Sequence, residues 1–205
     1  MTTILAFLAA AFVLAITPGP GLAYVVARTI AGGRREGLAS CFGTALGGLL
    51  HVVAAALGLS LVLAQSAAAF SVVKYAGAAY LVYLGVRMLL RRASAGVPQA
   101  VEPRGVRRVF VEGVVVEALN VKTALFFVAF LPQFVDPAGS VAMQLLGLGS
   151  ICVSFNTTAD IVAVLAAGRL LRSRSAREAR ARLMTRVSGA TMIALGVSLA
   201  MARKP

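Results

Sequence analysis

The sequence predicts an all-α membrane protein with six transmembrane helices, arranged as two inverted three-helix repeats. Of the 205 residues, 60% are hydrophobic and only 13% are charged, whereas a soluble domain is nearer half apolar and about a quarter charged. The apolar residues form runs close to the roughly 20 residues that a spanning helix needs. Arginines gather between alternate runs, as the positive-inside rule describes. We therefore expect residues 1–205 to form a single integral membrane domain.

The apolar runs define the expected spans in chain order. They cover residues 4–27, 37–64, 72–90, 110–131, 141–168 and 187–202. The second and fifth runs are long enough to tilt in the bilayer, and the last is short. A chain with five spans and one re-entrant segment is the alternative topology.

Basic residues follow the first, third and fifth runs, so the loops there are expected in the cytoplasm and both termini outside. These residues are Arg28, Arg34 and Arg35, then Arg87, Arg91, Arg92, Arg104, Arg107 and Arg108, then seven arginines from Arg169 to Arg186. Topology thus accounts for most of the formal charge of +13, and no nucleic-acid partner is expected. For residues 169–186 we favour a plain loop over an amphipathic helix on anionic lipid.

The third loop divides the chain into two halves. Residues 93–109 contain two prolines and two glycines and form the expected cytoplasmic linker between residues 1–92 and 110–205. Three spans in each half require an inverted repeat. Weak internal similarity agrees with it: Phe7 precedes Thr17 by ten residues, as Phe110 precedes Asn120.

The first span is interrupted by Thr17-Pro18-Gly19-Pro20-Gly21. Pro18 and Pro20 have no N–H for the carbonyls of Leu14 and Ile16, so we expect a broken helix. Thr17 is expected to cap a second half-helix that begins at Pro18. Its N–H groups and the freed carbonyls would suit the two charges of a zwitterion. The alternative is a proline kink that only shapes the bundle.

The fourth span carries Glu117 and Asn120-Val121-Lys122-Thr123. A lysine near the bilayer centre costs about 2.5–3.5 kcal/mol on insertion scales, so Lys122 is expected to face a partner or a cavity. It is a candidate to bind a substrate carboxylate or to titrate. The alternative, snorkelling to the interface, fits poorly with a position about ten residues from either end of the span. Glu117 lies within one turn of Asn120.

Two further ionisable residues lie within spans. Asp160 is the leading candidate for proton coupling, or a partner for Lys122; a purely structural pair is the alternative. Glu117 and His51 are further proton-coupling candidates, although a bond from His51 to a neighbouring backbone is the favoured interpretation. Near His51, the Gly43-x-x-x-Gly47 spacing is typical of close helix packing.

Other chemistry finds little support. Cys41 and Cys152 lie far apart without a CxxC spacing or a histidine cluster, so no metal site is predicted. The sequence contains no nucleophile triad or phosphate-binding loop, so neither enzyme activity nor a cofactor is expected.

In their order and spacing, several motifs resemble the lysine exporter (LysE/RhtB) family of amino-acid exporters. These motifs are the segment from Thr17 to Gly21, Lys74 to Leu81 with Tyr83-Leu84-Gly85, Asn120 to Ala124 with Phe126-Phe127, and Leu131-Pro132-Gln133-Phe134. The resemblance implies a six-helix exporter in the bacterial cytoplasmic membrane, driven by the proton gradient. One position departs from the family, which has Asn-Pro-Lys where this chain has Val121. Without that proline, the second helix break loses its strongest cause.

The expected function is export of amino acids or related small zwitterions by proton antiport. The substrate and gating residues are Thr17, Pro18, Gly19, Pro20 and Gly21, with Asn120 and Lys122 on the facing half of the site. We expect these two stretches to meet deep in the membrane and to enclose a wet pocket. The expected partners are a small-molecule substrate and membrane lipids, and a homo-oligomer remains an open option. The alternatives are export of a metal ion or drug-like compound, a membrane scaffold or assembly factor, and a membrane-embedded enzyme.

Overall fold

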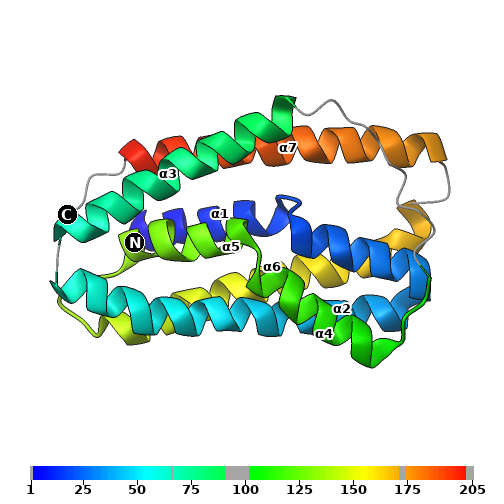
Figure 1. The fold of residues 1–205 in the computed structure, drawn as a ribbon, viewed down its shortest axis with the longest axis horizontal. Helices are drawn as coiled ribbons and strands as arrows, with labels where there is room; N and C mark the ends of the chain where they lie inside the picture. The colour runs from blue at the N-terminus through cyan, green and yellow to red at the C-terminus, as the bar shows by residue number, and fades with distance from the viewer. Residues whose placement is uncertain (1, 66, 91–101, 171–173, 202–205) are drawn as a thin grey trace.

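The computed structural model describes residues 2–65, 67–90, 102–170 and 174–201, and this part of the chain is helical without strands. Its elements are α1 (Thr2–Ile16), α2 (Pro20–Gln65), α3 (Ala67–Leu90), α4 (Val106–Ala118), α5 (Val121–Leu125), the π-helix η1 (Phe126–Phe130), the 3-10 helix η2 (Leu131–Phe134), α6 (Val141–Leu170) and α7 (Arg174–Met201). The helices run along the long axis of the molecule (Figure 1).

The helices are long and apolar enough for a membrane protein. In the described part of the chain, Pro20–Gly58 and Val141–Ala167 each satisfy the length and hydropathy of a spanning helix. A third candidate is the bent pair Val106–Ala118 and Val121–Phe134, whose two parts meet at 43°. Large apolar side chains face outward along these helices, among them Phe42, Leu50 and Val162. In water such a surface would be costly, whereas in lipid it is the ordinary exterior.

The helix α2 contains a sharp kink at Gly33, whose φ of 72° and ψ of −167° lie outside helical geometry. A side chain strains this backbone conformation, and glycine does not. The kink turns α2 back on itself, so Pro20–Gly32 and the segment after Gly33 form a hairpin. The hairpin, the start of α4, the end of α6 and the start of α7 lie together at the right-hand end of Figure 1. We call this end, which carries Arg28, the basic end.

Three expected boundaries differ from the structure. The first basic loop is the hairpin, with helical residues on both sides of Gly33. In the arginine-rich segment, Arg174 to Arg186 are the first half of α7, so the plain-loop interpretation is wrong there. Helix α4 begins at Val106, inside the linker predicted for residues 93–109. The part of that linker up to residue 101 lies outside the described residues.

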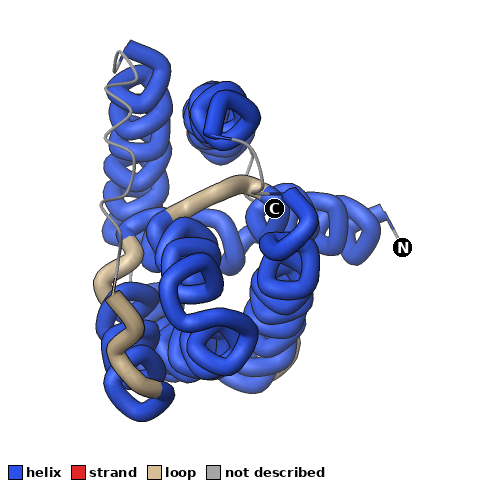
Figure 2. The backbone as a smooth tube through the Cα atoms, turned by 90° about the vertical axis from the view of Figure 1, so that its right-hand side faces the viewer, coloured by secondary structure: helices blue, strands red, loops and turns tan. Residues whose placement is uncertain are grey.

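The main core lies where α1, η1, η2 and α6 meet. Phe126, Phe127 and Phe130 are buried there with Phe7 and Leu145. A second layer consists of α3 and α7, which lie side by side (Figure 1). Figure 2 shows the bundle turned by 90°. The break between α1 and α2 and the break between α4 and α5 face each other inside the bundle, and both belong to the candidate site.

Candidate functional site

The first break separates two half-helices at Thr17–Gly19. The helical pattern continues through Thr17, whose N–H donates to the carbonyl of Val13 at 3.1 Å, and α2 begins at Pro20. The Thr17 hydroxyl also donates to that carbonyl, at 2.6 Å. The expectation that Thr17 caps the second half-helix is therefore wrong, because its oxygen is committed to the first. Gly19 takes that position, and its carbonyl accepts from the N–H of Ala23 at 3.0 Å.

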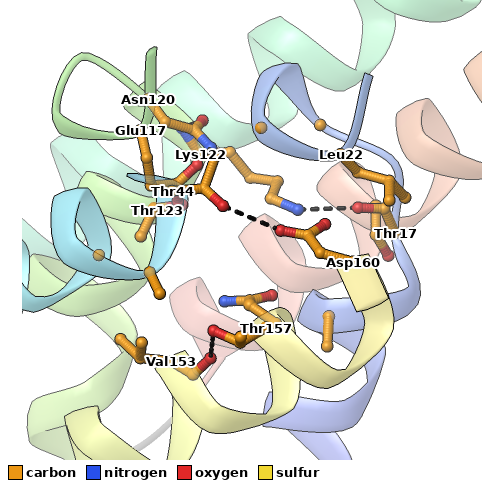
Figure 3. A pocket seen from close by; sticks show the side chains of 16 residues that line it. Thr17, Leu22, Thr44, Glu117, Asn120, Lys122, Thr123, Val153, Thr157 and Asp160 are labelled. Carbon is orange, nitrogen blue, oxygen red and sulfur yellow. Dashed lines mark hydrogen bonds between the residues drawn. The ribbon is translucent and has the colours of Figure 1, made fainter. Parts of the chain in front are cut away.

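Lys122 satisfies the carbonyls that the first break leaves free. Its Nζ donates to the carbonyl of Leu14 at 3.1 Å and to that of Thr17 at 2.8 Å. The Leu14 carbonyl is free because Pro18 has no N–H, as expected. The second acceptor is the carbonyl of Thr17, whereas the sequence predicted that of Ile16. Figure 3 shows the lysine reaching across to the break. The snorkelling interpretation is thus wrong, because the ammonium points at backbone from the other half of the chain.

The second break is real although its position lacks a proline. Asn120 is extended, with φ −75° and ψ 100°, and its side-chain oxygen accepts from the backbone N–H of Lys122 at 3.1 Å. This is an N-cap, which starts α5 at Val121. The first N–H groups of a helix have no intrahelical acceptor in any case, so valine fits there as well as proline. The expectation that Val121 weakens the break is therefore wrong.

Glu117 is fixed at the end of α4. Its Oε2 accepts from Asn120 Nδ2 at 3.0 Å, and its Oε1 accepts from the Thr123 hydroxyl at 2.6 Å. Its backbone carbonyl lies 2.9 Å from His51 Nε2, which confirms the favoured interpretation of His51. Buried carboxylates need such partners, and both oxygens of Glu117 have one.

Asp160, on α6, is only 7% exposed. Its Oδ2 lies 3.1 Å from the Thr44 hydroxyl, which also lies 2.9 Å from the carbonyl of Cys41. No ion pair joins Asp160 to Lys122 among the described residues. Thr44 was missed in the sequence, although a polar residue between Gly43 and Gly47 in an otherwise apolar run was a usable signal.

These groups line one pocket (Figure 3), with an empty volume of about 430 Å³ that includes space open at its mouth. Among the lining residues, the ionisable ones are Glu117, Lys122 and Asp160. Those predicted from the sequence are Thr17, Gly19, Gly21, Glu117, Asn120, Lys122 and Asp160; those not predicted as site residues include Thr44, Thr123, Asn156 and Thr157. Pro18, Pro20 and His51 are not part of the lining.

Two glycines allow the breaks to approach each other. A Cβ on Gly19 would lie 3.1 Å from Lys122 Nζ, and a Cβ on Gly21 would collide with Glu117 Oε2. Elsewhere α2 and α4 pack through Gly43 and Gly47, where a Cβ would meet the backbone carbonyls of Phe110 and Val114. The close-packing interpretation of this glycine pair is therefore confirmed.

Gly21→Ala should lower the free energy of unfolding, because its methyl group displaces the Glu117 carboxylate from Asn120 and Thr123. The expected loss is about one charged hydrogen bond, or roughly 1.5–3 kcal/mol. Gly147→Ala is the matched control, since nothing lies within 4 Å of a Cβ there. Thermal unfolding of the two purified variants in detergent measures the effect. Equal stability of the two variants would contradict the structural role of Glu117 at the break.

A polar pocket between two broken helices, inside an all-helical membrane protein, is the arrangement found in transporters. In the described part of the chain, no group of three His, Cys, Asp or Glu side chains is placed to hold a metal ion. Residues 12–203 match the LysE type translocator family. The chain belongs to this family and is a membrane transporter rather than an enzyme.

Relatives extend over most of the chain. An uncharacterized membrane protein of Vibrio cholerae is 31% identical over 205 residues, covering 97% of each protein. The homoserine/homoserine lactone efflux protein of Salmonella typhimurium is 31% identical over 144 residues, 70% of each. The leucine efflux protein of Salmonella choleraesuis is 28% identical over 155 residues, 73% of this chain and 72% of the other. No solved structure is significantly similar.

Proposed function

We propose that this protein exports amino acids or related small zwitterions across the bacterial cytoplasmic membrane by proton antiport. The observation that carries the proposal is the meeting of two broken helices at a pocket with one ammonium and two carboxylates. When all three groups are ionised, the formal charge of the pocket is −1. Such a pocket favours one added positive charge, which is either a proton or the ammonium of a substrate.

Asp160 is the proposed partner of the substrate ammonium. Both oxygens of Glu117 already accept hydrogen bonds, and Lys122 donates to two carbonyls. Asp160 has one bonded oxygen, and its Oδ1 has no hydrogen-bond partner in the described part of the chain. A substrate carboxylate fits at the start of α2, where Gly21 and Leu22 line the pocket and the first N–H groups lack intrahelical acceptors.

The names of the relatives agree with recognition through an ammonium. Leucine, homoserine and homoserine lactone, the compounds in those names, all carry a primary ammonium, whereas the lactone has no carboxylate. By this analogy, the ammonium is the group that every substrate of this chain must present, and the carboxylate contributes less. Asp160 then contributes more to binding than Lys122.

The surroundings of Asp160 accommodate a proton without rearrangement. The Thr44 hydroxyl has a single proton and lies between the Cys41 carbonyl and Asp160. When Asp160 is ionised, Thr44 donates to it; when Asp160 is protonated, the acid donates to Thr44 and Thr44 donates to Cys41. We therefore assign proton coupling to Asp160 rather than to Glu117 or to His51, whose Nε2 is occupied by the carbonyl of Glu117.

The proposed topology is six spans in two inverted halves, with both termini outside. The paired breaks support it, since each lies in the first span of its half. Helices α3 and α7, the third span of each half, also pack reciprocally: a Cβ on Gly85 would meet the carbonyl of Gly189, and a Cβ on Gly189 would meet that of Gly85. The side chain of Arg28 and the backbone N–H of Arg104 lie against the same buried carboxylate, Glu36, so these two basic segments meet at one end of the bundle.

The proposal is tested with purified protein in liposomes, over a panel of amino acids, amino-acid amides and N-acetylated amino acids. We expect uptake of some amino acids to require an acidic lumen, so that protons leave as substrate enters. Amino-acid amides should still be taken up, because they keep the ammonium group. N-acetylated amino acids should not be taken up, because they lack it. Protein-free liposomes are the control. If no compound accumulates above the control with a pH gradient, the chain is not such an exporter, and the scaffold interpretation gains support.

A further inference from the structure

One helical turn from the pocket toward the basic end, three apolar side chains fill the bundle. Val25, Cys41 and Val164 are at most 1% exposed and form a cluster of their own, separate from the main core. They come from the Pro20–Gly32 half-helix, from α2 after its kink, and from α6. Each lies three or four residues from a pocket residue, namely Gly21 or Leu22, Thr44 and Asp160. This apolar layer therefore separates the pocket from the basic end.

A charged layer lies one further turn along. Glu36 Oε1 accepts from the backbone N–H groups of Arg104 and Gly105, at 2.7 and 2.8 Å. Arg28 Nη1 donates to the carbonyl of Glu102 at 3.3 Å and lies 4.0 Å from Glu36 Oε2. We call Arg28, Glu36 and these N–H groups the latch. It joins the α2 hairpin to the start of α4.

The latch is buried yet incompletely satisfied. The side chains of Arg28 and Glu36 are each 6% exposed. In the described part of the chain, Arg28 Nε and Glu36 Oε2 have no hydrogen-bond partner. Buried charges of this kind gain little net stability unless every lone pair and proton is matched. Opening to water would hydrate both charges, which lowers the free energy needed to part them.

The Pro20–Gly32 half-helix is set apart from α1 and from the rest of α2. It is bounded by the break at Thr17–Gly19 and by Gly33, whose positive φ marks the turn of the chain. Besides the latch, Tyr24 holds it to α4, because its hydroxyl lies 3.0 Å from the Val109 carbonyl and from Glu112 Oε2. The half-helix therefore meets the rest of the bundle through these polar contacts and through Val25 in the apolar layer.

We propose that the Pro20–Gly32 half-helix is the inner gate of the pocket and that the latch holds it shut. Export requires a route from the cytoplasm into the pocket, and the apolar layer behind the latch closes that route. The direction of transport rests on the function proposed above, whereas the movement of the half-helix does not. Arg28 and Glu36 are thus gating residues that never contact substrate.

The native cysteines provide a test that needs no substrate. Cys41 lies in the apolar layer, and Cys152 is equally buried in the main core. A membrane-impermeant maleimide should label neither in the resting protein. In Glu36→Gln, which neutralises the latch, labelling of Cys41 should rise at least tenfold, from the cytoplasmic side only. Cys152 should stay unlabelled.

A second variant tests whether opening of the latch, rather than loss of the Glu36 charge, exposes Cys41. A Cβ on Gly32 would collide with the Glu36 carboxylate, so Gly32→Ala displaces the latch while keeping its charges, and Cys41 labelling should rise again. Gly147→Ala is the matched control and should match the parent protein. If Cys41 remains unreactive in both latch variants, with folding verified by monodisperse elution, the gate proposal is wrong. The same holds if Cys152 reacts equally, because the bundle has then loosened as a whole.

A crosslink tests the consequence for transport. In a Cys152→Ser background, Val25→Cys places a thiol beside Cys41, since these two residues belong to the same cluster. Oxidation with copper phenanthroline should form a disulfide that stops export, and reduction should restore it. Adding Cys41→Ser should abolish the effect. Undiminished export by the crosslinked protein would show that the gate proposal is wrong. If no variant exports any compound but Cys41 labelling still rises in the latch variants, the proposed function alone is wrong.

Discussion

Lys122→Met should abolish transport. The methionine fills much the same space beside Gly19 but leaves the carbonyls of Leu14 and Thr17 without a donor. Each unsatisfied buried carbonyl costs about 1–3 kcal/mol. The pocket would also lose its positive charge, leaving Glu117 and Asp160 as two unbalanced carboxylates. Export of a preloaded substrate, normalised to the folded fraction, measures the loss.

Gly19→Ala distinguishes positioning from charge. Its Cβ would lie 3.1 Å from Lys122 Nζ and Cε, so the ammonium must shift by a few tenths of an ångström while its charge stays. We expect an intermediate rate, above that of Lys122→Met. Full transport by folded Lys122→Met would show that the bonds across the breaks are dispensable. A variant that fails only because it does not fold would assign Lys122 to structure alone.

The site could be predicted from the sequence because a proline removes a hydrogen bond at a fixed position of its own helix. A missing N–H at Pro18 frees the carbonyl of Leu14 in any helical context, and a lysine within an apolar run must find acceptors. The pairing of Lys122 with that carbonyl joins residues 108 positions apart. No periodicity encodes such a distance. The sequence therefore predicted that the two stretches meet at one pocket, but it did not predict the hydrogen bonds from Lys122 to the carbonyls of the first break.

The second break shows a different limit. The absence of a proline at Val121 does not prevent the break, because the N-cap at Asn120 is sufficient to start a helix. The latch was missed for another reason. In the sequence, Arg28 and Arg104 count only as topology signals. The hairpin at Gly33 places Glu36 near the Arg28 side chain, and the Glu36 carboxylate also accepts from the backbone N–H of Arg104.

Asp160→Asn should abolish gradient-driven transport while leaving the protein folded. Asparagine has nearly the same shape, and its side-chain oxygen accepts the hydrogen bond from Thr44. It carries no charge for a substrate ammonium and takes up no proton. A hydrogen bond to a charged group is worth about 1.5–3 kcal/mol, so substrate affinity should fall by about 10- to 100-fold. Accumulation with and without a pH gradient should become equal.

Glu117→Gln is the informative comparison, because both oxygens of Glu117 accept hydrogen bonds. The glutamine amide nitrogen is a donor, so at one of these two positions it faces another donor and a hydrogen bond is lost. The segment between α4 and α5 is then held less firmly, and thermal stability falls. The remaining folded protein should still respond to the pH gradient. If instead Glu117→Gln no longer responds to the pH gradient and Asp160→Asn still does, Glu117 is the proton carrier. The hydroxyl between Asp160 and Cys41 would then stabilise α2 against α6 without carrying protons.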